Sequence, residues 1–207
     1  MLRTQFIAAP ETGSRRLMIV LHGLGDSMDG YSWWPRAMRL PWLNYLLVNA
    51  PEPYYGGFSW YDIETGQGIE ASRKLLFHLL DGLKDYSAAE IVFSGFSQGC
   101  LMALEVGGRY PHRFAGIAGI SGYAHEPEQL IREFSPVAKR QRFLLTHGTQ
   151  DPLIPIQKVR EQIKLLQNAG LQIEWREFAK AHTIAGEEEM SAIRQFVQAC
   201  FAAAPGE

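Results

Sequence analysis

A serine set between glycines is the residue of this chain best placed for chemistry. Ser97 lies at the centre of the pentapeptide G-F-S-Q-G at 95–99, after the apolar run 91–93 and before a helix-like segment at 100–105. A strand, G-x-S-x-G and a helix, in that order, are typical of a nucleophile elbow, in which a sharp turn exposes the serine hydroxyl above a sheet. We therefore expect Ser97 in a sparsely populated backbone conformation, with small flanking residues because the strand and helix backbones nearly touch.

Two downstream residues could complete a catalytic group with this serine. A serine hydroxyl is a weak nucleophile at neutral pH and needs a base, usually histidine, and a carboxylate that fixes the histidine tautomer. Asp151 is the only aspartate after Ser97, and His182 is the only histidine after Asp151. Each follows a predicted strand, although either alone could be a turn or surface residue, and several glutamates remain alternatives for the carboxylate. We predict Ser97 as nucleophile, His182 as base and Asp151 as the residue that orients it.

Acyl transfer also needs donors for the negative charge that develops on the carbonyl oxygen. The backbone N–H of Gln98, next to the nucleophile and at the positive end of a helix, is the first candidate. The second is the N–H of Leu24, because the glycines around it in the loop 22–26 would let the backbone turn inward. The same loop could equally be a glycine turn that leads into a helix. His22 and His147 each precede a glycine at a strand end, and we expect them to shape loops.

The elements that must position these residues follow an alternating pattern. Apolar runs alternate with amphipathic segments, which predicts an α/β domain with a mostly parallel sheet and helices on both faces. We expect strands at 4–9, 16–21, 45–48, 90–94, 114–120, 142–146 and 172–178, and helices at 30–40, 68–84, 98–109, 126–134, 156–169 and 186–201. The turn 10–14 suits a hairpin, so the first strand should be antiparallel. Ligands bind at the carboxyl ends of parallel strands, where we expect Ser97, Asp151 and His182 all to lie.

The composition fits one globular domain over residues 1–207 and narrows the function classes. The formal net charge is −2, and no run of lysine and arginine points to nucleic acid or to an anionic membrane surface. No segment approaches the ~20 apolar residues of a membrane span, and the N-terminus lacks a secretory apolar region. We therefore expect a cytoplasmic monomer or weak homodimer. No motif indicates a metal site or a cofactor, and Cys100 and Cys200 should be buried free thiols.

The motifs together resemble the carboxylesterase/phospholipase family of α/β-hydrolases, which includes the acyl-protein thioesterases. The resemblance runs nearly end to end and rests on L-H-G-L-G-D at 21–26, S-W-Y-D-I at 59–63, G-F-S-Q-G at 95–99, H-G-T-Q-D-P-L-I-P at 147–155, and His182. It implies an α/β-hydrolase fold with Ser97, Asp151 and His182 as catalytic residues. It also implies Leu24 and Gln98 as oxyanion donors, and hydrolysis of a small-molecule ester or thioester through an acyl-enzyme, without a cofactor.

Aromatic and apolar residues near the predicted site would suit an acyl group. The candidates that border the catalytic loops are Phe58, Trp60, Leu153 and Ile154. The segment 49–60 is shorter than the resemblance leads one to expect, and the loop 63–68 is too short to cover a long acyl chain. These departures favour small to medium acyl groups. Residues 123–137 could form a small cap over the site or serve packing alone.

Two other functions fit the same residues. A serine peptidase or amidase could use the same three side chains, but it must protonate an amine leaving group. The short chain, without an added recognition domain, favours the esterase. A non-catalytic binding protein with this fold is the third possibility, although a binding module has no need of an aligned serine, histidine and aspartate.

Overall fold

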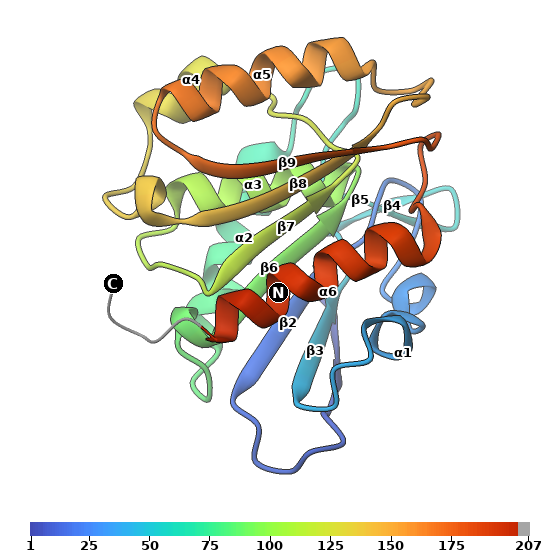
Figure 1. The fold of residues 1–207 in the computed structure, drawn as a ribbon, viewed down its shortest axis with the longest axis vertical. Coiled ribbons are helices and arrows are strands. Elements are labelled where there is room, and N and C mark those ends of the chain that lie inside the picture. Colours follow the sequence, from blue (N-terminus) through green and yellow to red (C-terminus); the bar gives the residue numbers. More distant parts are fainter. Residues whose placement is uncertain (203–207) are drawn as a thin grey trace.

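A seven-stranded mixed sheet is the centre of the computed structural model, which describes residues 1–202 (Figure 1). Residues 203–207, at the end of the predicted domain, lie outside the described residues. Across the sheet the strands are β1 (Thr4–Ile7), β3 (Leu43–Val48), β2 (Arg16–Leu21), β6 (Ile91–Phe96), β7 (Gly116–Ile120), β8 (Arg142–Gly148) and β9 (Gln172–Phe178). The pairing of β1 is antiparallel, and the other pairings in this sheet are parallel. The predicted fold class is therefore confirmed.

The first strand is antiparallel, but the predicted hairpin with the second strand is wrong. β1 pairs with β3, with Thr4 opposite Val48 and Ile7 opposite Tyr45, and β3 lies between β1 and β2. The residues of β1 are exposed or half-buried, whereas all of β2 after Arg16 is buried. A strand covered on both faces belongs in the interior of a parallel sheet, so the buried β2 and β3 lie inside the sheet and β1 is left at the edge.

Helices cover both faces of the sheet (Figure 1). In Figure 1, α6 (Gly186–Ala202) lies in front of the sheet, and it packs with α1 (Trp34–Met38). The other face is covered by α2 (Ile69–Gly82), α3 (Gln98–Arg109), α4 (Pro127–Arg132) and α5 (Ile156–Asn168). The side chains of β2 alternate between the two cores: Ile19 faces the α3 side and Val20 the α6 side. Within residues 1–202, no helix combines the length and apolar composition needed to cross a membrane.

Smaller elements depart from the sequence-based expectation. The helix expected at 30–40 is reduced to α1, which begins only after a separate 3₁₀ turn at Asp29–Tyr31 and ends where Arg39 adopts a left-handed conformation, with φ 51°. A separate hairpin of β4 (Glu52–Tyr54) and β5 (Gly57–Ser59) was not predicted. Short 3₁₀ turns occur at Asp29–Tyr31, Ala88–Glu90 and Ala138–Arg140.

Both cysteines are buried free thiols, as predicted. Burial raises the pKa of Cys100 to about 12 and that of Cys200 to about 11, so both are protonated at neutral pH. The Cys100 sulfur takes up space beside two glycines, since a Cβ added at Gly119 or Gly122 would come within 2.5 Å of it. Close packing therefore accounts for a cysteine just inside α3.

Candidate active site

Ser97 forms a tight turn between β6 and α3. Its dihedral angles, φ 54° and ψ −116°, are rarely adopted by residues other than glycine. A Cβ at Gly95 would lie 2.1 Å from the carbonyl oxygen of Gly99, and one at Gly99 would lie 2.4 Å from that of Leu21. The Ser97 N–H donates to the Ile120 carbonyl at 2.8 Å, which fixes the turn to β7. The expected strained serine and its small neighbours are therefore confirmed.

A chain of hydrogen bonds joins Ser97, His182 and Asp151. His182 Nε2 lies 2.9 Å from Ser97 Oγ, and His182 Nδ1 lies 2.7 Å from Asp151 Oδ2. An ionised carboxylate only accepts hydrogen bonds, so Nδ1 carries the proton and Nε2 is free to accept that of the serine hydroxyl. The three residues follow β6, β9 and β8, whose carboxyl ends meet at one edge of the sheet. The arrangement can deprotonate a serine as it attacks an acyl carbon.

Several donors hold the buried carboxylate of Asp151. Its Oδ1 accepts the backbone N–H groups of Leu153 and Ile154, each at 2.9 Å. Burial raises the pKa of Asp151, but the hydrogen bonds from Ile154, His182 and Leu153 outweigh it and hold the pKa below its usual range. Asp151 is therefore ionised at neutral pH and can stabilise an imidazolium at His182.

Two further histidines take the loop-shaping role expected of them. His22 Nε2 accepts the N–H of Ala50 at 3.0 Å, and its Nδ1 donates to the Gly23 carbonyl at 2.6 Å. His147 Nε2 donates to the Ile154 carbonyl at 2.9 Å. Burial lowers the pKa of both imidazoles, which favours their neutral forms. His22 thus fixes the start of the 22–26 loop, and His147 fixes the loop that carries Asp151.

Leu24 and Gln98, the predicted oxyanion donors, both line the cavity at Ser97. The Gln98 side chain has a second role that the sequence did not reveal. Its Oε1 accepts the N–H of Trp60 at 2.9 Å, and its Nε2 donates to the Tyr61 carbonyl at 2.8 Å. The residue after the nucleophile therefore ties the segment that follows β5 to the start of α3.

A cavity of about 440 Å³ opens beside Ser97 and His182. Much of its wall is apolar or aromatic, from Tyr61, Ile63, Phe96, Tyr123, Leu153 and Ile154. Such a wall suits an apolar group next to the bond that Ser97 would attack. In the described part of the chain, no group of three or more histidine, cysteine, aspartate or glutamate side chains could hold a metal ion.

Two of the four predicted pocket residues line this cavity and two do not. Leu153 and Ile154 are in its wall, whereas Phe58 and Trp60 are not. Trp60 is fully buried, and its indole N–H donates to the His22 carbonyl at 2.9 Å. Phe58 packs against the core on β5. The prediction for Phe58 and Trp60 is wrong because both side chains are committed to packing, and Tyr61 is the aromatic residue of this segment that reaches the cavity.

The segment 123–137, which the sequence suggests as a possible cap, contributes one residue to the cavity wall, Tyr123. Its helix, α4, packs against α3 and α5. Leu130 of α4 is buried, and a Cβ at Gly108 of α3 would lie 2.5 Å from it. Close packing thus holds α4 against the body of the molecule.

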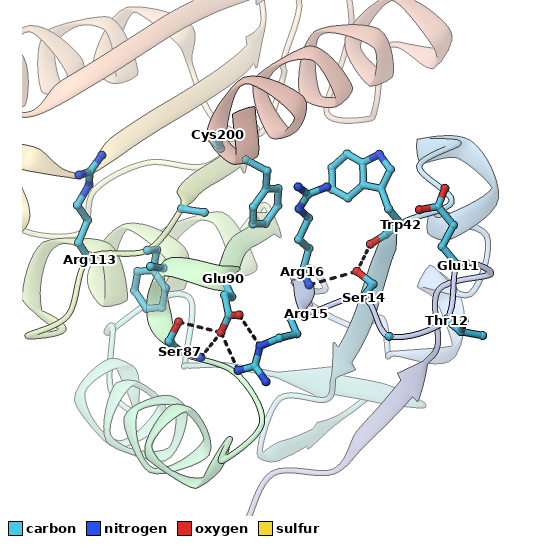
Figure 2. Close-up of a pocket in the computed structure, with 15 residues that line it drawn as sticks. Glu11, Thr12, Ser14, Arg15, Arg16, Trp42, Ser87, Glu90, Arg113 and Cys200 are labelled. Atoms are coloured by element: carbon cyan, nitrogen blue, oxygen red, sulfur yellow. Dashed lines mark hydrogen bonds and ion pairs between the residues drawn. The ribbon is translucent and has the colours of Figure 1, made fainter. Parts of the chain in front are cut away.

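A larger cavity, of about 970 Å³, lies among the starts of β2, β6 and β7 and the end of α6 (Figure 2). Figure 2 shows the ion pair of Arg15 with Glu90 beside it, and Arg16 next to Trp42. None of its lining residues is shared with the cavity at Ser97. Ligands of parallel sheets bind at the carboxyl ends of the strands, so the smaller cavity is the candidate active site.

A buried ion pair fixes the loop that carries His182. Lys180 is 5% exposed and Glu189 fully buried, and Lys180 Nζ lies 2.6 and 2.7 Å from the two carboxylate oxygens. Glu189 also accepts the N–H of Ala185 at 2.6 Å, and the Lys180 carbonyl accepts that of Gln150 at 3.1 Å. The pair therefore joins the loops of Asp151 and His182 to the first turn of α6.

Replacing Lys180 with methionine should lower the free energy of unfolding by about 3–5 kcal/mol, because it leaves the Glu189 carboxylate buried without a counter-charge. Urea denaturation at neutral pH measures this loss. The double variant Lys180→Met with Glu189→Gln keeps an acceptor for Ala185 and removes the unpaired charge, so it should recover much of the stability. A single variant within about 1 kcal/mol of the wild type would contradict the prediction.

The strand order, the elbow after β6 and the helices on both faces are those of an α/β-hydrolase. The family model described as phospholipase/carboxylesterase matches residues 2–201, and the chain belongs to this family. Acyl-protein thioesterase 1 of Schizosaccharomyces pombe is 33% identical, over 93% of this chain and 94% of that protein. The predicted family and enzyme class, a hydrolase of the carboxylesterase and thioesterase type, are therefore confirmed.

Solved structures show the same fold. Esterase PE8 is 25% identical and superposes with a TM-score of 0.83, over 96% of this chain and 99% of that one. The Bacillus cereus carboxylesterase gives a TM-score of 0.82 at 18% identity, over 97% of this chain and 95% of that one. At 18% identity, the similarity to the Bacillus cereus carboxylesterase supports the fold alone.

Proposed function

We propose that this protein hydrolyses carboxylic esters or thioesters of small to medium acyl groups through an acyl-enzyme on Ser97. The observation that carries the proposal is the hydrogen-bond chain from Ser97 through His182 to Asp151 beside a largely apolar cavity. Ser97 Oγ attacks the acyl carbon as His182 Nε2 takes its proton, and His182 then protonates the departing alcohol or thiol. A water molecule, deprotonated by His182, attacks the acyl-enzyme, and the proton returns to Ser97 as the acid leaves.

The negative charge formed in both steps needs donors and a counter-charge. The N–H groups of Leu24 and Gln98 are proposed to bind the oxyanion, and each such donor is worth about 3 kcal/mol in a dry site. Asp151 keeps the His182 proton on Nδ1 and stabilises the imidazolium that forms during each transfer. All of these groups come from the protein chain, so the proposed reaction needs no cofactor.

The proposed limit on acyl length comes from the mouth of the cavity. Ile63 and Leu153, which line it, are 57% and 70% exposed. The short loop beside Ile63 closes on itself, since the N–H groups of Thr65 and Gly66 donate to Asp62. Each methylene adds about 0.8 kcal/mol only while it is being buried. An acyl chain that passes these exposed side chains therefore gains little further binding.

A series of p-nitrophenyl esters of increasing acyl length tests the proposal. We expect kcat/KM to rise by up to about fourfold per buried methylene and to level off once the chain reaches the mouth. The rate with Ser97→Ala measures the background hydrolysis of each ester. Rates with thioesters and amides of the same acyl groups show which leaving group is preferred. A continued rise to palmitoyl esters would contradict the length limit, and faster amide than ester hydrolysis would favour the peptidase alternative.

We further propose that residues 1–207 act as one domain, as a monomer or weak homodimer in the cytoplasm. Two free thiols suit a reducing compartment, which supports this location. Size-exclusion chromatography at several protein concentrations tests the oligomeric state.

We also propose that, in the segment 123–137, Tyr123 contacts the substrate while α4 serves packing.

A further inference from the structure

Lys158 lines the cavity at Ser97 but takes no part in the proposed chemistry. It is the third residue of α5, and its Nζ lies 5.6 Å from the centre of the Tyr123 ring. The Tyr123 hydroxyl lies 3.4 Å from that of Tyr61, which lines the same cavity. Lys158 thus places a positive charge against an aromatic wall of the substrate cavity.

A lysine at this position is electrostatically unfavourable for the helix itself. The N-terminus of a helix carries partial positive charge, so acidic side chains are favoured in the first turn and basic ones in the last. The first turn of α5 has no acidic residue. Within residues 1–202, no carboxylate lies at ion-pair distance from Lys158. Lys158 departs from this preference for acidic residues, and it does so beside the candidate active site. Such departures from local sequence preference are expected at functional sites.

We propose that Lys158 selects substrates that carry a negative charge, a carboxylate or a phosphate, on the part of the molecule held at the Tyr123 wall of the cavity. The Lys158 ammonium group and the N-terminus of α5 both favour an anion there. The inference rests on the proposed hydrolysis at Ser97 and narrows its substrate class to acidic esters or thioesters.

Asp26, which is exposed, also lines the cavity, and its negative charge disfavours an anion beside it. Asp26 is in the loop after β2, where its Oδ1 accepts the N–H of Ser27 at 2.8 Å. Lys158 contacts the ring of Tyr123, which follows β7. Repulsion by Asp26 and attraction by Lys158 therefore both place an anionic group at the Tyr123 wall and away from the Leu24 loop.

Two matched pairs of esters test the inference and locate the charge. p-Nitrophenyl hydrogen adipate and p-nitrophenyl adipamate differ by a terminal carboxylate or amide on the acyl side. p-Carboxyphenyl hexanoate and p-carbamoylphenyl hexanoate make the same comparison on the leaving-group side. In at least one pair, Lys158→Gln should lower the ratio of kcat/KM for the anionic ester to that for the neutral ester about fivefold. This is the effect expected of losing an exposed ion pair worth about 1 kcal/mol. Because the ratio is compared between the wild type and the variant, the intrinsic difference in reactivity between the two esters cancels.

Lys164→Gln is the matched control, because Lys164 is exposed on the same helix and does not line the cavity. It should leave the anionic-to-neutral ratio of each pair unchanged. The difference in anionic-to-neutral ratio between the wild type and Lys158→Gln should also shrink as salt is added, because salt screens an exposed charge.

The outcomes separate the inference from the proposed function. If the neutral esters are hydrolysed in a Ser97-dependent way but Lys158→Gln changes neither ratio, the inference is overturned and the proposed function stands. If no ester is hydrolysed, or if hydrolysis persists in Ser97→Ala, the proposed function fails and the inference with it. A changed ratio in the acyl pair supports esters of dicarboxylic acids, and one in the other pair supports esters of acidic alcohols.

Discussion

Replacing Ser97 with alanine should lower kcat/KM for p-nitrophenyl esters by at least about 10⁴-fold and leave the fold intact. The change removes the attacking oxygen, while His182 stays hydrogen-bonded to Asp151 and the cavity keeps its shape. The remaining groups can bind the ester and its oxyanion, but they cannot form an acyl-enzyme. Initial rates with the purified variant, and a circular dichroism spectrum matching the wild type, measure the two parts of the prediction.

Ser97→Gly separates the loss of the hydroxyl from the strain of the turn. It should be as inactive as the alanine variant but more stable by about 1 kcal/mol, because glycine accepts a φ of 54° without strain. For a chain of this size that corresponds to roughly 2–4 °C in the unfolding midpoint. An alanine variant that kept more than about a hundredth of the wild-type rate would show that another group is the nucleophile.

Ser94→Ala is the matched control for both variants. Ser94 lies on β6, is fully buried, and its hydroxyl has no hydrogen-bond partner within residues 1–202. Removing that hydroxyl should leave activity unchanged and cost no stability, because a buried hydroxyl without a partner contributes no hydrogen bond.

The residues at the carboxyl ends of the strands could be predicted because their signals are local. A G-x-S-x-G turn between a strand and a helix fixes where Ser97 lies, and the chain offers one later aspartate and then one later histidine. Parallel strands bring such loops to one edge whatever their spacing in sequence. That topology brings His182 close enough to Ser97 and Asp151 for its contacts of 2.9 and 2.7 Å.

The pairing of β1 and the wall of the cavity depend on distant residues and could not be predicted in this way. A turn of hairpin length allows two strands to pair but does not exclude the insertion of a third, and β3 takes that place. The indole of Trp60 is directed inward by its bond to the His22 carbonyl, 38 positions away. Lys180 gives no sequence signal of burial, because its partner Glu189 lies on another element.

Replacing Asp151 with asparagine should lower kcat by about 10³–10⁴-fold with little change in the surrounding loop. The asparagine oxygen can still accept the N–H groups of Leu153 and Ile154 that Asp151 Oδ1 accepts now. Its amide N–H₂ then faces His182 Nδ1 and donates to it. The imidazole is left with its proton on Nε2, toward Ser97, and cannot accept the serine proton. Steady-state kinetics at neutral pH measure the loss.

The pH dependence checks the same geometry. The pKa of Asp151 is held below its usual range by its hydrogen bonds, so its carboxylate keeps its charge as the pH falls moderately below neutrality. A carboxyl group whose pKa is lower in the folded than in the unfolded state stabilises the fold at any pH above its unfolded-state pKa. This stabilisation is lost as the pH falls through the folded-state pKa. The stability gap between the wild type and Asp151→Asn should therefore close as the pH falls below about 4.

Glu177→Gln is the control for loss of a carboxylate near the site without loss of the hydrogen-bond chain. Glu177 lies on β9, where its carboxylate is paired with Arg160 at 2.6 Å and is partly exposed. We expect activity within about twofold of the wild type and a stability loss below about 1 kcal/mol. If Asp151→Asn kept more than about a tenth of the wild-type kcat, the prediction would be contradicted and a glutamate would have to orient His182. An acceptor at Nδ1 is needed to hold the proton there and leave Nε2 basic toward Ser97.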